Sequence, residues 1–213
     1  RSVYGNSAPR SGVMKAYDYA LEALLMDGRR LPGSPLAWVR WAAGLAVLML
    51  IVAGCRAGPT EPTEQDGILI YAAVVRRLAG PDDTFGGELE KPVLYLVRRT
   101  DDTAGDPGGA KGASVVLPGD VQAGITAALS DLPSQVVWVD RFEDVPLDEE
   151  TRAVADGGVI IEVGNITVGS AMRVQVPGSI YVAGLAAGGA TYVVEKRSGE
   201  WVVTGTTGPV WIS

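Results

Sequence analysis

Residues 190–206, ATYVVEKRSGEWVVTGT, carry the clearest structural pattern of the chain. Two runs rich in β-branched and aromatic residues flank Ser198-Gly199, and a two-residue connection of this kind is typical of a β-hairpin. The turn sets Arg197 opposite Glu200, so that opposite charges face each other across the two strands. The sequence therefore predicts a hairpin near the end of the chain.

Further segments before this hairpin have the composition of strands, because each is short and rich in Val, Ile or aromatic residues. The candidates are residues 92–99, 135–140, 158–163, 173–176 and 179–185. The segments from residue 135 onward, together with the hairpin, predict a meander of strands, whereas the segment 92–99 stands apart earlier in the chain.

Two helices are expected ahead of this meander. Thr63 and Asp66 have the spacing of a capping box, and Gly80-Pro81 stops the helix that they begin. Its apolar face carries Ile68, Tyr71, Val75 and Leu78. The second helix is predicted over residues 118–132, with Pro133 as its stop and an apolar face of Val121, Ile125, Leu129 and Leu132.

Helices followed by strands predict an α+β domain, with two helices packed on a curved antiparallel sheet of about five or six strands. The closing hairpin, with Tyr192 and Trp201, loosely resembles the curved sheets of the NTF2-like and cystatin-like folds.

The one cysteine of the chain, Cys55, ends the run Leu50-Ile-Val-Ala-Gly-Cys55. Arg29, Arg30 and Arg40 precede the apolar residues 41–52, as the charged start of a secretory signal precedes its apolar centre. The run resembles the lipobox of bacterial lipoproteins. This resemblance implies cleavage just before Cys55, lipid attachment at that residue, and a place on the extracytoplasmic face of the cell membrane.

A simple membrane anchor is the alternative for this segment. Only 15 uncharged residues separate Arg40 from Arg56, whereas a helix that crosses the hydrocarbon needs about 20. An anchor would have to begin near Leu36, with Arg40 reaching the interface.

The domain organisation follows from these features. Met14 and Met26 are the candidate initiators, so residues 1–25 are expected to be an upstream extension or a mis-assigned start. Residues 26–54 are the predicted signal peptide and 55–65 a tether rich in Pro, Thr and Glu. Residues 66–213 form a single predicted extracytoplasmic domain.

Charge and composition exclude several functions. From Cys55 onward the chain has 22 acidic and 12 basic residues, a net charge of about −10, which argues against binding nucleic acid or anionic lipid through charge. The chain contains no histidine, so Ser-His and Cys-His pairs and imidazole metal ligands are excluded. Carboxylate chemistry, oxygen-ligand metals and binding without chemistry remain. No cofactor is expected.

Two acidic groups are candidates for a site. Asp140, Glu143 and Asp144 follow a predicted strand, with further carboxylates at residues 148–150; they could hold a cation or ligand or form a solvated loop. The other group lies near the two ends of the first predicted strand and is interpreted as solvated turns. Its members are Asp82, Asp83, Asp101 and Asp102.

The favoured hypothesis is a lipid-anchored protein without enzymatic activity, which binds a ligand or an envelope protein or acts as an accessory envelope factor. A hydrolase that uses two carboxylates on cell-wall glycan is the alternative, with Asp140, Glu143 and Asp144 as its candidate residues. A purely structural lipoprotein is the third hypothesis.

Overall fold

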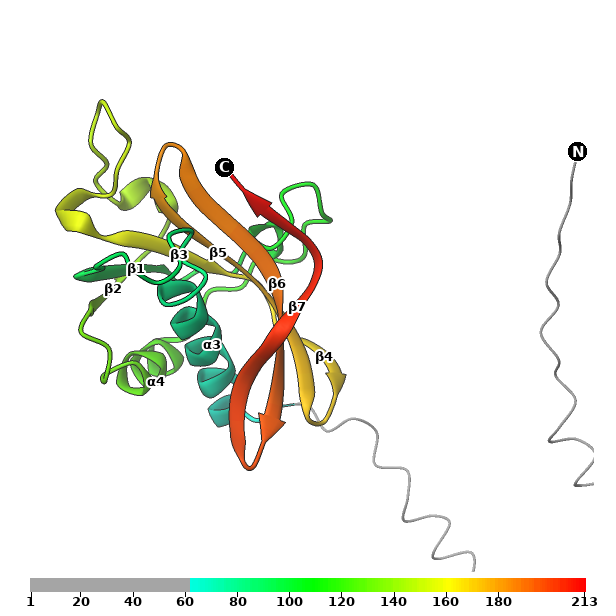
Figure 1. Ribbon diagram of the computed structural model, residues 1–213. Helices are drawn as coiled ribbons and strands as arrows, with labels where there is room; N and C mark the ends of the chain where they lie inside the picture. The colour runs from blue at the N-terminus through cyan, green and yellow to red at the C-terminus, as the bar shows by residue number, and fades with distance from the viewer. Residues whose placement is uncertain (1–61) are drawn as a thin grey trace, which may run out of the picture. The chain divides into compact units, whose positions relative to one another are not determined.

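Figure 1 shows the computed structural model, which describes residues 62–213. The predicted signal peptide, Cys55 and most of the tether lie outside the described residues. The helices are α3 (Glu64–Ala79) and α4 (Gly119–Ala128), with 3-10 turns η1 (Asp102–Ala104), η2 (Phe142–Asp144) and η3 (Ala155–Gly157). The strands are β1 (Val93–Val97), β2 (Gln135–Val139), β3 (Val159–Val163), β4 (Thr167–Ser170), β5 (Arg173–Ala183), β6 (Ala186–Arg197) and β7 (Glu200–Ile212).

The described strands form one seven-stranded sheet in the order β2-β1-β3-β5-β6-β7, with β4 paired to β5. The predicted α+β class, with helices packed on an open sheet, is confirmed. The sheet is mixed rather than purely antiparallel, because β1 runs parallel to both β2 and β3. The reason lies in the connections: α4 joins β1 to β2 as a crossover, and crossovers join parallel strands.

The hairpin predicted at Ser198-Gly199 is confirmed, with Arg197 opposite Glu200. Both turn residues have positive φ, 52° at Ser198 and 92° at Gly199, as the favoured two-residue hairpin turn requires. The flanking strands β6 and β7 are longer than predicted, and they form the tall, twisted part of the sheet in Figure 1.

Two strand predictions differ from the structure. Residues 173–183 form one continuous strand, β5, where the sequence predicts two, at residues 173–176 and 179–185. Pro177 is tolerated because β5 pairs with β3 only from Gly178 onward, so no ladder bond on that side needs an N–H at Pro177. Strand β4 was not predicted, since its sequence TVGS has no apolar alternation.

Helix α3 begins and ends as predicted. The Thr63 side chain accepts a hydrogen bond from the Asp66 N–H, and the Asp66 carboxylate accepts one from the Thr63 N–H, which completes the capping box. Gly80 caps the other end. Because the helix starts at Glu64, the folded domain begins slightly before the predicted boundary at residue 66. The second helix, α4, stops at Ala128, four residues before the predicted end.

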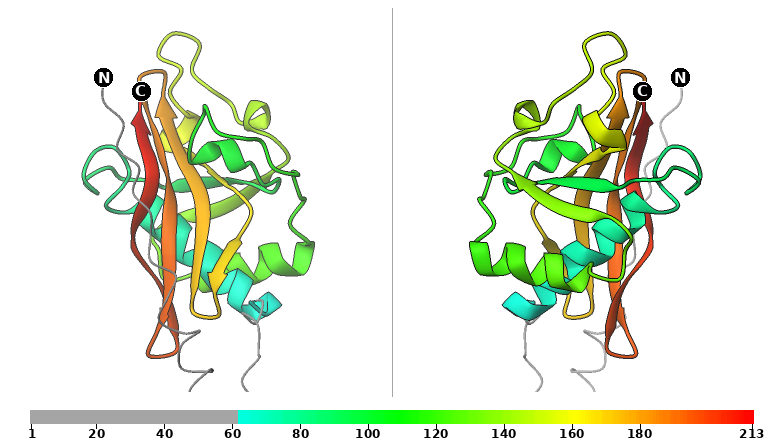
Figure 2. Two further views of the ribbon diagram at one scale, coloured as in Figure 1. Left: turned by 90° about the vertical axis from the view of Figure 1, so that its right-hand side faces the viewer. Right: turned by 90° about the vertical axis from the view of Figure 1, so that its left-hand side faces the viewer.

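The sheet has an apolar core on each face. On one face α3 and α4 pack against the sheet, and Figure 2 shows both helices on the same side of it. On the other face the β2–β3 connection, residues 140–158, covers a smaller cluster that includes Val97, Val145, Val154 and Ile160. This second layer is what positions the candidate site.

A buried ion pair closes the loop between α3 and β1. Asp83 is fully buried, and one of its oxygens accepts a hydrogen bond of 2.5 Å from the Lys91 ammonium. The other oxygen accepts bonds from the N–H groups of Phe85 and Gly87. Burial opposes ionisation, but Lys91 and these N–H donors hold the pKa of Asp83 below its ordinary value. The prediction that Asp83 lies in a solvated turn is therefore wrong.

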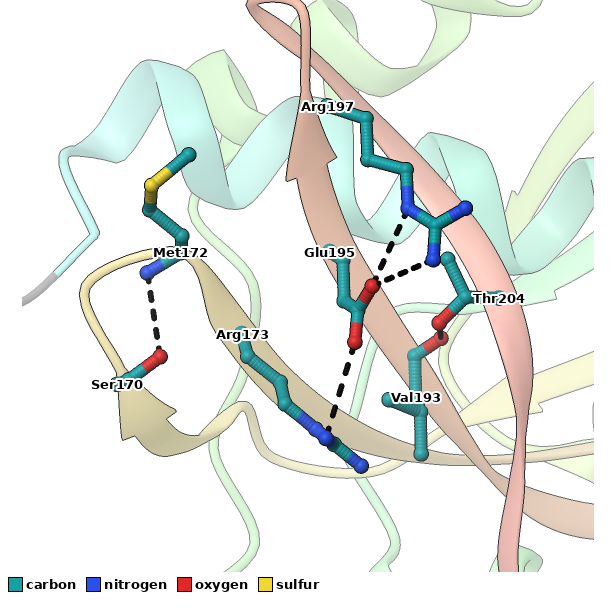
Figure 3. Close-up of polar contacts among 7 residues, drawn as sticks. All are labelled: Ser170, Met172, Arg173, Val193, Glu195, Arg197 and Thr204. Atoms are coloured by element: carbon teal, nitrogen blue, oxygen red, sulfur yellow. Dashed lines mark hydrogen bonds and ion pairs between the residues drawn. The ribbon is translucent and has the colours of Figure 1, made fainter.

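A second charged cluster joins the lower ends of β5 and β6 (Figure 3). Glu195 on β6 lies between Arg197, at 2.8 Å, and Arg173, its partner in the neighbouring strand, at 3.7 Å. The hydrogen bonds from Arg197 lower the pKa of the Glu195 carboxyl. These exposed side chains pair with one another, so the cluster is a structural feature of the sheet surface.

Candidate functional site

The candidate site is a cavity of about 270 Å³ at the carboxyl ends of the three parallel strands. Residues that follow β1 and β2 line it, together with Glu162 near the end of β3 and the loop around Lys111. In sheets with parallel strands, ligands bind where the carboxyl ends of the strands meet. We call this cavity the charged pocket.

Glu162 is the central side chain of the charged pocket. It shares a strand face with Ile160, which packs in the smaller core, while Ile161 and Val163 face the helices. Glu162 is half-buried, and its side-chain carboxylate forms no hydrogen bond or ion pair with another described residue. Burial raises its pKa to about 7, and the charges of Asp101 and Glu143 add to the effect. A carboxyl of this kind gains and loses a proton near neutral pH.

Asp101 and Asp102 form the side of the pocket that follows β1, and their carboxylates order the backbone there. Asp101 accepts hydrogen bonds from the Thr103 N–H, at 2.8 Å, and the Thr103 hydroxyl, at 2.7 Å, and so caps η1. Asp102 accepts bonds from the Asn165 N–H, at 2.6 Å, and from the Asn165 side-chain amide, at 3.0 Å. Both carboxylates line the pocket while they shape its backbone.

Asn165 connects this side of the pocket to the loop that carries Lys111. Its side-chain N–H donates to the Ala113 carbonyl at 2.8 Å, and its side-chain oxygen accepts from the buried Thr100 hydroxyl at 2.9 Å. The Thr100 hydroxyl oxygen in turn accepts a hydrogen bond from the Val115 N–H. The loop is therefore fixed to the ends of β1 and β3 by a continuous hydrogen-bond network.

The predicted acidic residues after β2 divide between two roles. Asp140 and Glu143 line the charged pocket, and Asp140 also pairs with Arg98 at 2.8 Å. Asp144 does not line the pocket. It pairs with Arg141 at 3.4 Å and accepts the Arg141 N–H, which closes η2.

The structure also brings together residues that the sequence left apart. Asp101 and Asp102 lie in the same pocket as Asp140 and Glu143, although they belong to the other predicted acidic group. Sequence reasoning missed Glu162. Its signal was a single charge within the apolar strand VIIEV, whose other side chains are buried on both faces.

Cations also line the charged pocket. Arg99 and Lys111 both line it, and Arg99 forms a bridge to Val116. Neither forms an ion pair with another residue of the described part. Across residues 62–213, no group of three or more Cys, Asp or Glu side chains is arranged to hold a metal ion. The pocket is thus a cavity lined by charges of both signs.

Comparison of the chain with protein-family models, curated proteins and solved structures gives no match. The resemblances to lipoproteins at Cys55 and to the NTF2-like and cystatin-like folds therefore stay predictions. No helix within residues 62–213 is long and apolar enough to cross a membrane.

Proposed function

We propose that this protein is a lipid-anchored, extracytoplasmic lipoprotein whose folded domain binds a small polar ligand in the charged pocket. Two independent observations support the proposal. The lipobox-like run from Leu50 to Cys55 supports the extracytoplasmic location and the lipid anchor. The half-buried, unpartnered Glu162 in a cavity of about 270 Å³ supports the binding role.

Glu162 is the observation that carries the binding role. A half-buried carboxylate without a partner costs folding free energy, since burial disfavours its charged form. Strongly shifted groups in clefts are concentrated at functional sites. The cost of burying Glu162 has a purpose if a ligand pairs with its carboxylate.

The anchor is tested by following the mature protein in cell fractions. Wild-type protein should stay with membranes through a high-salt wash and dissolve in detergent, because two or more acyl chains hold a protein firmly. Cys55→Ser should accumulate as an uncleaved precursor without lipid. A Cys55→Ser protein that is cleaved and membrane-bound like the wild type would refute the lipid anchor.

The binding role is tested by equilibrium dialysis of the full-length protein, in detergent, against the small-molecule extract of the cells that produce it. Mass spectrometry then identifies compounds that the wild type retains. The proposal expects at least one compound that is retained by the wild type and by Glu200→Gln, an exposed control, but not by Glu162→Gln. Retention that is the same for all three proteins would contradict a site at Glu162.

A carboxylate-dependent hydrolase is the second candidate, and the same residue favours it. A general acid is most effective when its pKa lies near the working pH, and burial raises that of Glu162 to about 7. Glu143 or Asp101 would then serve as the second carboxylate. Cleavage of purified cell-wall glycan by the wild type, with loss in Glu162→Gln, would select this function over binding alone.

A further inference from the structure

The charged pocket carries unpaired charges of both signs, and this feature indicates the class of ligand. Glu143 and Glu162 are the lining carboxylates that form neither an ion pair nor a side-chain hydrogen bond in the described part, and Arg99 and Lys111 are the lining cations that form neither. The other charged groups in the lining are engaged, such as Asp140 with Arg98 and Arg141 with Asp144.

The backbone fixes the positions from which the two cationic side chains extend. Arg99 lies on a bridge to Val116, flanked by the bonds Thr100 N–H to Val115 carbonyl and Leu117 N–H to Arg98 carbonyl, both 2.8 Å. Lys111 precedes Gly112, which packs so closely on the Asp102 carboxylate that a side chain at residue 112 would collide with it. The positive side of the pocket is therefore built on fixed backbone.

The two carboxylates also extend from backbone that is fixed by hydrogen bonds. Glu162 belongs to β3, between strands β1 and β5. Glu143 lies in η2, where the Asp144 N–H donates to the Arg141 carbonyl at 3.1 Å and the Val145 N–H donates to the Phe142 carbonyl at 3.2 Å. Unpaired charges carried on a fixed backbone around one cavity are partly organised in advance for a third partner.

We propose that the ligand is a small zwitterion with a free ammonium and a free carboxylate, such as an amino acid or a short peptide. This inference rests on the proposed binding role of the charged pocket. Glu162 and Glu143 receive the ammonium, whose N–H groups only donate, and Arg99 and Lys111 receive the carboxylate, which only accepts. A cavity of about 270 Å³ suits a ligand of this size.

The test uses diglycine and two probes that each lack one charge, glycinamide and N-acetylglycine. Each is titrated by calorimetry into the full-length protein in detergent. Diglycine should bind at least about tenfold more tightly than either half-charged probe, which corresponds to about 1.4 kcal/mol. Glu162→Gln and Arg99→Gln should each weaken diglycine about tenfold or more, whereas Glu200→Gln and Arg152→Gln should leave it unchanged.

The outcomes separate this inference from the proposed function. Equal binding of diglycine and either half-charged probe would overturn the zwitterion, as would unchanged diglycine binding by Glu162→Gln. If diglycine does not bind while dialysis still shows a compound that depends on Glu162, the binding role stands and the ligand class is wrong. If dialysis also shows no such compound, both fail. Circular dichroism spectra that match the wild type ensure that the variants are folded.

Discussion

The carboxylate of Asp66, at the start of α3, accepts a hydrogen bond of 2.7 Å from the indole N–H of Trp201 on β7, 135 residues further along the chain. The same oxygen accepts a bond of 2.8 Å from Lys196 on β6. Asp66 also completes the capping box with Thr63. One side chain thus starts the helix and fixes it to the hairpin that closes the sheet.

Trp201→Phe should lower the free energy of unfolding by about 1.5–3 kcal/mol at neutral pH, since hydrogen bonds to charged groups are the stronger ones. Trp211→Phe is the matched control, because the Trp211 indole donates to a neutral acceptor, the Ala104 carbonyl, at 3.0 Å. That variant should lose about 1 kcal/mol. Urea unfolding measures both, and equal losses would contradict the role of Asp66.

The Asp66 bonds also predict an acid dependence. Hydrogen bonds from Lys196, Trp201 and Thr63 hold the pKa of Asp66 far below its ordinary 3.8. Because the folded pKa is lowered, this stabilisation is complete above 3.8 and declines as the pH falls below it. The difference in stability between wild type and Trp201→Phe should therefore shrink in acid.

Lys91→Met should cost about 3–5 kcal/mol, because it leaves the buried charge of Asp83 without its cation. Arg77→Met provides the comparison. It breaks a 2.9 Å ion pair with Asp82 whose side chains are 43% and 26% exposed, and pairs of this kind contribute about 1 kcal/mol or less. Thermal or urea unfolding that gives the two variants the same stability would show that Asp83 is not buried with Lys91.

Asn165→Asp should destabilise the protein at neutral pH by about 2 kcal/mol or more, because it places a second carboxylate against Asp102 and removes two N–H donors. The loss should ease as acid protonates the pair. Asn165→Ala, which removes these two bonds and the one from the Thr100 hydroxyl without adding charge, should show a loss that does not ease in acid. Melting temperatures between pH 3 and pH 8 distinguish the two patterns.

Glu162→Gln should stabilise the protein at alkaline pH. The pKa of Glu162 is raised from 4.5 to about 7, so the folded state holds this proton more tightly than the unfolded state. Wild-type stability should therefore fall as the pH rises from 4.5 to 7, and the neutral variant should escape this loss. Above pH 8 the variant should be more stable by roughly 1–3 kcal/mol. Glu200→Gln should follow the wild-type curve.

The sequence predicted the parts of the fold that depend on near neighbours. Thr63 and Asp66 are three residues apart, and Ser198 and Gly199 form their own turn, so α3 and the hairpin followed from local patterns. The parallel arrangement of β1 with β2 and β3 did not, because it depends on which strand edges meet after α4 and residues 140–158 have crossed the sheet.

The candidate site was predicted only in part for the same reason. Asp140 and Glu143 were found from their place after a strand, and both line the charged pocket. Asp101 lies in the same pocket because the strand order places β1 beside β2. The spacing of residues along the sequence does not reveal that order. Asp83 appeared to be one of a pair of turn residues, and only the fold of its loop reveals Lys91 as its partner.

The central claim is that Glu162 lies in an organised, charged pocket rather than on an ordinary surface. The most direct test is a titration of its side-chain carboxyl by carbon NMR in the full-length protein, assigned by comparison with Glu162→Gln. We predict a midpoint near pH 7, which moves down in Asp101→Asn and Glu143→Gln as repulsion is removed. A midpoint near the ordinary 4.5 that neither variant changes would contradict the account.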